Sequence, residues 1–115
     1  MIERIDAGPR MSEAVVHNGV AYLAGQVSTG GAMEIGGQTR EVLAAIDGLL
    51  ARAGTDKSRV LLAQIFLADM ADFPGMNSVW DQWVVPGHTP ARATVQAALA
   101  KPQWKVEIVI TAALP

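Results

Sequence analysis

The sequence predicts an α+β sandwich in which two helices cover one face of a mixed β-sheet. Two segments repeat their apolar residues at helical spacing, and several others are short extended runs bounded by turn residues. The predicted order is strand, hairpin, helix, strand, helix and two closing strands. Because 115 residues suffice for one domain with a real core but not for two ordinary ones, we expect residues 1–115 to form a single domain.

Three short strands are predicted at the start of the chain. Ile2 to Asp6, Glu13 to His17 and Val20 to Gly25 are extended runs. The last two are separated by Asn18 and Gly19, a pair that predicts a hairpin because both central positions of the favoured turn need positive φ. Val20 to Gly25 is therefore expected to be the return strand of this hairpin.

A loop and then the first helix are predicted from residue 30 onward. Glycine pairs at 30–31 and 36–37 favour a plain loop over a phosphate cradle, since neither the P-loop pattern nor a dinucleotide fingerprint is present. The helix is expected from about Gln38, with Gly54 as its C-terminal cap. Its apolar positions are Val42, Leu43, Ile46, Leu49, Leu50 and Ala53.

The second half of the chain predicts a buried strand, a helix and a final strand. Val60 to Ala68 is almost entirely apolar, which is typical of a central strand covered on both faces. Asp72 is a candidate cap for a helix in which Trp80 and Trp83 belong to the core, although a ligand-stacking pair is the alternative. The apolar stripe of this helix consists of Met76, Val79, Trp80, Trp83 and Val84.

The stretch from Pro90 to Ala97 carries the most informative pattern. With the two-residue period of a strand, Arg92, Thr94 and Gln96 point to one face and small apolar residues to the other, so we expect the apolar face to pack and the polar face to stay available. A guanidinium here suits a carboxylate, which it can hold with two parallel hydrogen bonds. The alternative is an ordinary surface or interface arginine, and the strand alone favours that alternative.

Glu107 is the second candidate, because a carboxylate inside the β-branched strand from Lys105 to Ala113 is costly to bury unless it is paired or used as an acid or base. A solvent-facing position is the alternative, which the chain alone favours. If the last two strands are neighbours, Glu107 faces Ala97 and lies about 17 Å from Arg92. A bulge or an adjacent subunit would then be needed to bring both residues to one ligand.

Composition excludes several functions. The net charge of −2 disfavours nucleic acid and anionic membranes as partners. The absence of cysteine excludes disulfides and thiolate metal sites, and His17 and His88 have no metal-ligand spacing. No signal peptide or membrane span is evident, so we expect a cytoplasmic protein. With half of its residues apolar and 17% charged, the chain is expected to hide part of its surface in an oligomer.

Several stretches form a pattern that is specific as a set and covers nearly the whole chain. They are Gly25–Gln26, Phe66 to Asn77, Pro90 to Arg92 and Val106 to Ile108, with Trp80 to Val85 and Val95 to Ala97 as further matches. This pattern resembles the RidA family, also called YjgF/YER057c/UK114, and in particular its compact YoaB-like branch. The resemblance implies a chorismate-mutase-like fold of the Bacillus type. It also implies a homotrimer whose sheets form a central barrel, with ligand sites in the clefts between subunits.

The resemblance further implies an enamine/imine deaminase without a cofactor or metal. Its substrates would be reactive 2-imino acids such as 2-aminoacrylate and 2-iminopropanoate, which are hydrolysed to the 2-oxo acid and ammonia. Carried over to this sequence, Arg92 would hold the substrate carboxylate and Glu107 would position or activate the attacking water. The Gly25 backbone and Asn77 would help to line the cleft.

Three positions depart from the pattern of many members of that family. Arg10 stands where many have tyrosine, Thr94 where many have cysteine, and Ala24 where serine is common. These changes bear on substrate range and turnover and leave the carboxylate anchor in place. Arg10 and Thr94 are therefore included among the expected substrate-binding residues, and an inward-pointing Arg10 would favour a more acidic ligand.

Two other functions compete with imine hydrolysis. The same cleft in a sensor or interaction protein would bind a small carboxylate without turnover, and the presence of both Arg92 and Glu107 disfavours this alternative. An activity of the endoribonuclease L-PSP or translation-inhibitor type fits poorly with an acidic chain that has no histidine pair and no basic stripe.

Overall fold

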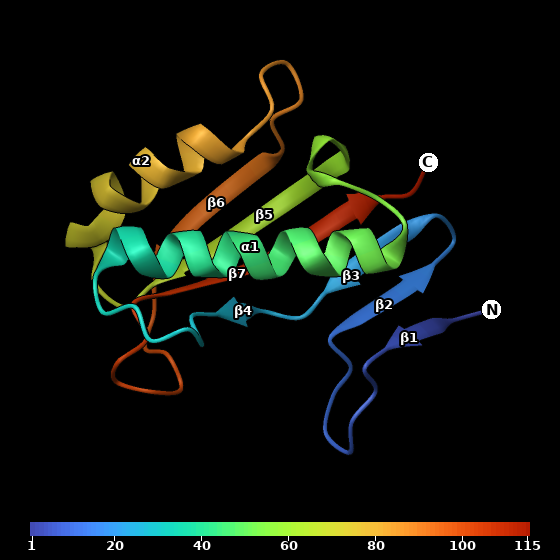
Figure 1. Cartoon of the computed structure of the whole chain (residues 1–115), viewed down its shortest axis with the longest axis horizontal. Coiled ribbons are helices and arrows are strands. Elements are labelled where there is room, and N and C mark those ends of the chain that lie inside the picture. Colours follow the sequence, from blue (N-terminus) through green and yellow to red (C-terminus); the bar gives the residue numbers. More distant parts are fainter.

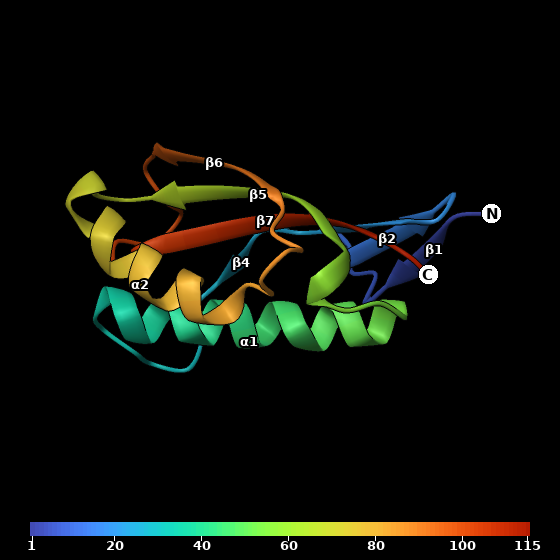
Figure 2. The ribbon, with the colours of Figure 1, turned by 90° about the horizontal axis from the view of Figure 1, so that it is seen from above.

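The structure is a computed structural model that describes residues 1–115. It has two layers, a seven-stranded sheet and two helices that lie on one of its faces (Figures 1 and 2). The α+β fold class predicted from the sequence is confirmed. The elements are β1 (Glu3–Ile5), β2 (Ala14–His17), β3 (Val20–Leu23), β4 (Gln26–Val27), α1 (Ile35–Ala53), β5 (Val60–Leu67), α2 (Phe73–Trp83), β6 (Ala91–Gln96) and β7 (Val106–Ala113), with 3₁₀ turns at Lys57–Arg59 and Met70–Asp72.

The strand order is β1-β2-β3-β7-β5-β6, with β4 also paired to β7. All pairs are antiparallel except β5 and β6, so the sheet is mixed. The expectation that the last two strands could be neighbours is wrong, because β5 lies between them. The chain leaves β5, forms α2 on one face and returns as the parallel edge strand β6, which leaves the other edge of β5 free to pair with β7.

The predicted hairpin is confirmed in detail. Asn18 and Gly19 connect β2 to β3, and their φ angles are 51° and 76°. Both central positions of the turn therefore adopt the left-handed conformation that the Asn-Gly pair predicts.

Helix α1 begins at Ile35, three residues before the predicted start. Gly36 and Gly37 are thus helical, and the prediction that they form a loop is wrong. A Cβ atom on Gly37 would lie 3.0 Å from the Cβ of Ala32, so glycine allows the preceding loop to cross the first turn of the helix. This close packing outweighs the low helix propensity of glycine. At the other end, Gly54 caps the helix with φ 88°, as predicted.

Strand β5 is interior to the sheet, as predicted, but only one of its faces is covered. Ala63, Ile65 and Leu67 are fully buried beneath the helices, whereas Leu62 and Gln64 are exposed on the opposite face. The prediction of cover on both faces is wrong for a single chain, because both helices lie on the same side of the sheet (Figure 2). The uncovered side is called the open face below.

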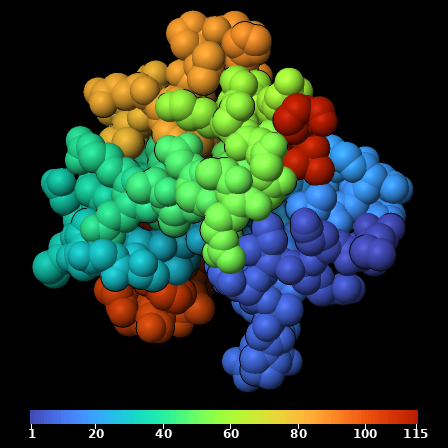
Figure 3. Space-filling model, turned by 45° about the vertical axis from the view of Figure 1, so that its right-hand side comes forward, coloured from blue at the N-terminus to red at the C-terminus, as the bar shows by residue number.

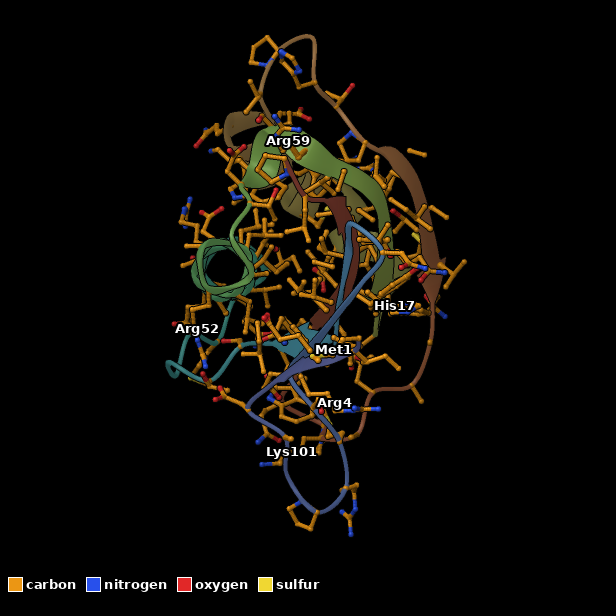
Figure 4. The ribbon with its side chains drawn as sticks, turned by 90° about the vertical axis from the view of Figure 1, so that its right-hand side faces the viewer. Met1, Arg4, His17, Arg52, Arg59 and Lys101 are labelled. Carbon is orange, nitrogen blue, oxygen red and sulfur yellow. The ribbon has the colours of Figure 1, made fainter.

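The core lies between the helices and the covered face of the sheet, where side chains fill the interlayer space (Figure 4). The predicted stripe of α2 is confirmed for Met76, Val79, Trp80 and Trp83, which are all buried. Val84 lies just after the helix and packs, partly buried, against the core. Asp72 occupies the N-cap position of α2, but its side chain makes no capping hydrogen bond. Neither helix combines the length and the apolar character that crossing a membrane requires.

Candidate functional site

Arg92 projects from β6 toward the helical layer. Its neighbour in register is Ala63, which is buried beneath the helices. The Arg92 Nη1 donates a hydrogen bond to Asn77 Oδ1 at 2.8 Å, and the guanidinium carbon lies 5.7 Å from the centroid of the Phe73 ring and 5.4 Å from that of Trp80. Three residues of α2 therefore position the cation.

The alternation predicted for this strand is correct, but the faces are reversed within one chain. The polar residues of β6 face α2, and the small apolar residues Ala91, Ala93 and Val95 are exposed on the open face. The reason is that α2 supplies the aromatic rings and the amide that accommodate a guanidinium. The apolar side of the strand is left without cover.

The Arg92 guanidinium has no carboxylate partner. The single salt bridge of the chain joins Arg52 to Asp6, at a nitrogen to oxygen distance of 2.7 Å. Arg92 is half-buried and uses one of its five N–H donors in the hydrogen bond to Asn77. A partly desolvated cation with free donors is a favourable place for an anion, because charge-assisted hydrogen bonds then compensate the lost hydration.

Thr94 lies two residues beyond Arg92 on the same face of β6. Its Oγ1 atom is buried and has no hydrogen-bond partner. A buried unsatisfied hydroxyl is uncommon, and here it lies next to the free cation. We call Arg92, Asn77 and Thr94 the arginine cluster. Gln96, the next residue on this face, does not extend the cluster, since its Oε1 accepts a hydrogen bond from Met70 N at 2.7 Å.

Glu107 projects from β7 to the open face. Its two neighbours in the strand, Val106 and Ile108, are fully buried on the helical side. The Glu107 carboxylate makes no hydrogen bond within the chain, and it packs so closely against the Gly25 backbone that any Cβ at position 25 would overlap it. We call Glu107 and Gly25 the glutamate cluster.

The segment around Gly25 is fixed by the residues on either side. Ala24 N donates to the Glu13 carbonyl oxygen at 2.8 Å, and Gln26 Nε2 donates to Glu13 Oε2 at 3.3 Å. Gln26 also pairs with Ile108 through β4, which brings Gly25 beside the start of β7. The approach of Gly25 to Glu107 therefore results from long-range strand pairing that sequence periodicity cannot show.

One chain does not bring the two clusters together. Glu107 is in register with Phe66 and through it with Val95, whereas Arg92 is in register with Ala63. Arg92 and Glu107 are thus two strands and three residues apart, about 10 Å in each direction, and their side chains leave opposite faces of the sheet.

The remaining candidates lie elsewhere. Arg10 is exposed in the loop between β1 and β2, at the opposite end of the strand order from β6. This loop protrudes from the body of the molecule (Figure 3). His17 and His88 are exposed, and no group of three or more potential metal ligands exists in the chain.

The sequence did not predict that Phe73 and Trp80 are neighbours of Arg92. With Asn77 they occupy positions i, i+4 and i+7 of α2 and therefore share one face of the helix. This spacing is visible in the sequence and could have identified them, but from the sequence Trp80 is expected in the core or in a ligand-stacking pair with Trp83. It is in fact both a core residue and a contact of Arg92.

Comparisons with known proteins identify the family of the chain. The model of the family described as Endoribonuclease L-PSP matches residues 1–114. A RutC family protein of Haemophilus ducreyi is 54% identical over 99% of this chain and 97% of its own length. The RutC family protein YoaB of Escherichia coli is 50% identical over 98% of both chains. The crystal structure of a YjgF family member from Neisseria meningitidis has a TM-score of 0.98 at 50% identity, covering 100% of this chain and 96% of its own.

A more distant relative carries a functional name. The 3-aminoacrylate deaminase RutC of Acinetobacter baylyi is 42% identical over 71 residues, which are 62% of this chain and 56% of the relative. The full-length matches are much stronger, and they share both the fold and the compact length. The chain therefore belongs to the RidA (YjgF/YER057c/UK114) family and is similar to its YoaB-like members.

Proposed function

We propose that the protein is an enamine/imine deaminase that hydrolyses 2-imino acids of the 2-aminoacrylate and 2-iminopropanoate type to 2-oxo acids and ammonia. The observation that carries this proposal is the half-buried Arg92 guanidinium, which lies close to two aromatic rings and has no carboxylate partner. The deaminase name of the Acinetobacter baylyi relative supports the same reaction class at the level of the family.

The chemistry requires an anchored carboxylate and an oriented water. Arg92 holds the substrate carboxylate in two parallel hydrogen bonds, and the rings of Phe73 and Trp80 restrict the guanidinium plane. Glu107 takes a proton from water as the water oxygen bonds to C2 of the iminium group. The resulting carbinolamine then loses ammonia, which takes up that proton, and C2 becomes the carbonyl carbon of the 2-oxo acid.

The substrate itself supplies much of the reactivity, because a protonated imine hydrolyses in water without help. An enamine first gains a proton on its terminal carbon and becomes the iminium ion. The protein has only to hold the carboxylate, position one water and carry one proton, which needs no cofactor. The closely packed Gly25 backbone keeps the Glu107 carboxylate in a defined position for this role.

We further propose that the site forms between subunits of a homotrimer. Arg92 and Glu107 face opposite sides of one sheet, so a partner subunit is needed to bring an arginine cluster to a glutamate cluster. The open face also carries exposed apolar side chains that suit burial in an interface. Tyr22, Leu62 and Val95 are 50%, 37% and 48% exposed.

The second candidate is a protein that binds a small carboxylate without turning it over. Arg10 and Thr94 favour this candidate, because they replace residues that are common in the family. Both positions are expected to contact the ligand. Ribonuclease activity has less support. Neither cluster contains a histidine, and the chain has a net charge of −2.

The test is an assay of ammonia release from a freshly generated imine. D-Alanine and a D-amino-acid oxidase supply 2-iminopropanoate, with catalase to remove peroxide, and the rate of imine decay is compared with and without the protein. We expect acceleration that saturates with substrate and is competed by pyruvate. An unchanged decay rate, together with saturable pyruvate binding, would support the carboxylate-binding protein instead.

A further inference from the structure

The largest pocket of the chain lies away from both clusters. It has a volume of about 540 Å³, within the range of small-molecule sites, and it is bounded by the loop after β4 and the loop before β7. These loops meet beside the first turn of α1 (Figures 1 and 3). The lining residues that matter are Ser28, Met33, Gln38, Lys101, Trp104 and Lys105.

A single buried side chain forms hydrogen bonds to both walls of the pocket. Gln38 is 2% exposed, and its Nε2 donates to the carbonyl oxygens of Ala32 at 3.1 Å and Gln103 at 2.9 Å. Its Oε1 accepts from Lys105 N at 2.8 Å. All hydrogen-bonding groups of this amide except one acceptor position are thus used to join the loops, so the pocket is formed before any ligand arrives.

The charges around the pocket favour an anion. Lys101 and Lys105 are among its lining residues, neither forms a salt bridge, and no lining residue is acidic. The nearby acid, Glu41, is occupied by the loop, since it accepts hydrogen bonds from Ser28 Oγ, Gly30 N and Ala32 N. The two lysines therefore give the lining a net positive charge.

The apolar part of the lining favours a flat ring. The Lys101 ammonium lies 5.1 Å from the centroid of the Trp104 ring, so a carboxylate bound to Lys101 would place the rest of its molecule beside the indole. Met33 and Pro102 are also lining residues and add apolar surface. We propose that this pocket binds a small aromatic carboxylate, independently of the reaction at Arg92 and Glu107.

The experiment is a titration of the intact protein with benzoate, followed by calorimetry and by the NMR signal of the Trp104 indole N–H, which is assigned from its loss in Trp104→Phe. We expect saturable binding that shifts the Trp104 signal. The double variant Lys101→Met/Lys105→Met should weaken binding about tenfold or more. Benzamide, which has the ring without the charge, and acetate, which has the charge without the ring, should both bind more weakly than benzoate.

Two matched controls separate this pocket from other cations of the chain. Lys57 also lies over a tryptophan, 5.6 Å from the centroid of the Trp83 ring, so Lys57→Met removes an equivalent cation and should leave benzoate binding unchanged. Arg92→Ala removes carboxylate binding at the other site and should leave the shift of the Trp104 signal unchanged. A Trp104 shift that survives in the lysine double variant, is lost in Arg92→Ala, or is absent in the wild type at millimolar benzoate would overturn the proposal. Trp104→Leu made in the Arg92→Ala background and judged by calorimetry provides a second loss-of-binding variant should the double variant not fold.

Discussion

Arg92 and Glu107 leave opposite faces of the same sheet, two strands and three residues apart in register. Arg92 is held by Asn77 on the helical side, and Glu107 lies against Gly25 on the open side. A ligand as small as a 2-imino acid cannot reach around the sheet to touch both. Under the proposed mechanism, the two side chains would therefore act on one ligand only in an assembly of chains.

Mixing two inactive variants tests this arrangement directly. If each site takes its arginine from one subunit and its glutamate from another, trimers formed from equal amounts of Arg92→Ala and Glu107→Gln chains should regain about one quarter of the wild-type sites. The measurement is the rate of imine hydrolysis after the chains are unfolded and refolded together. Each variant refolded alone is the control. No recovery in mixed trimers of confirmed composition would mean that both residues of a site come from one chain.

Substitution of Arg92 should remove the carboxylate anchor. In Arg92→Ala, imine hydrolysis should fall to near the uncatalysed rate and pyruvate binding should weaken by about 1.5–3 kcal/mol, the usual contribution of a hydrogen bond to a charged group. Arg92→Lys should recover only part of the activity, since one ammonium cannot form two parallel hydrogen bonds. Arg59 is exposed, and Arg59→Ala is the matched control. Full activity in a folded, trimeric Arg92→Ala protein would refute the mechanism.

Gly25→Ala should move the Glu107 carboxylate, because the new methyl group occupies its position. We expect a lower kcat with nearly unchanged pyruvate binding, as for Glu107→Gln, since the carboxylate anchor lies elsewhere. Steady-state kinetics and calorimetry check the two halves of this expectation. Gly48 in α1 has no atom near its missing Cβ, so Gly48→Ala is the control and should be neutral or stabilising by about 0.5–1 kcal/mol. Equal kcat values for both alanine variants would contradict the role of Gly25.

Glu41 should make the stability of the loop after β4 depend on pH. The Ser28 hydroxyl, followed by the backbone N–H groups of Gly30 and Ala32, holds the pKa of Glu41 below its ordinary value of 4.5. A lowered folded pKa means that the stabilisation is complete above pH 4.5 and is lost as the pH falls through the folded value. The thermal midpoint of wild type should therefore exceed that of Glu41→Gln at pH 7, and the difference should shrink below pH 4.5.

The control for this pH series is Glu3→Gln, which alters an exposed carboxylate that makes no hydrogen bond within the chain. Its midpoint should follow the wild type at every pH. A constant difference between wild type and Glu41→Gln from pH 7 to pH 3 would show that the carboxylate charge does not stabilise the loop.

The helices and strands themselves could be predicted from the sequence, because their apolar residues recur at regular helical or strand spacing. The stripe of α1 from Val42 to Leu50 and the alternation of β7 both appear in the structure as predicted. The order of the strands could not be predicted. It depends on β7 pairing with β5 and β3, which are distant in the chain, and no local pattern in Val106 to Ala113 specifies those partners.

The site was predictable to a similar extent. Residue type and the family resemblance identify Arg92 and Glu107 as candidates, but they do not predict where the two side chains lie. Alternation determines which residues of β6 share a face, whereas only the packing of α2 determines that the Arg92 face is the covered one. The pocket at Gln38 was missed entirely, because its walls are two loops that are distant in the chain. The hydrogen bond that holds them together joins Gln38 to Gln103, 65 residues later.

The central place of β7 in the sheet also has a consequence for biosynthesis. Every other strand precedes it in the chain, yet it pairs with β3, β4 and β5. While a ribosome is still making the earlier residues, the N-terminal hairpin and the β5–α2–β6 unit have no strand between them and expose the edges that β7 will join. The nascent chain must keep these two parts apart and unaggregated until the residues after Lys105 emerge from the exit tunnel. Glu107 is among the first of those residues, so the strand that joins the two parts also delivers the proposed base.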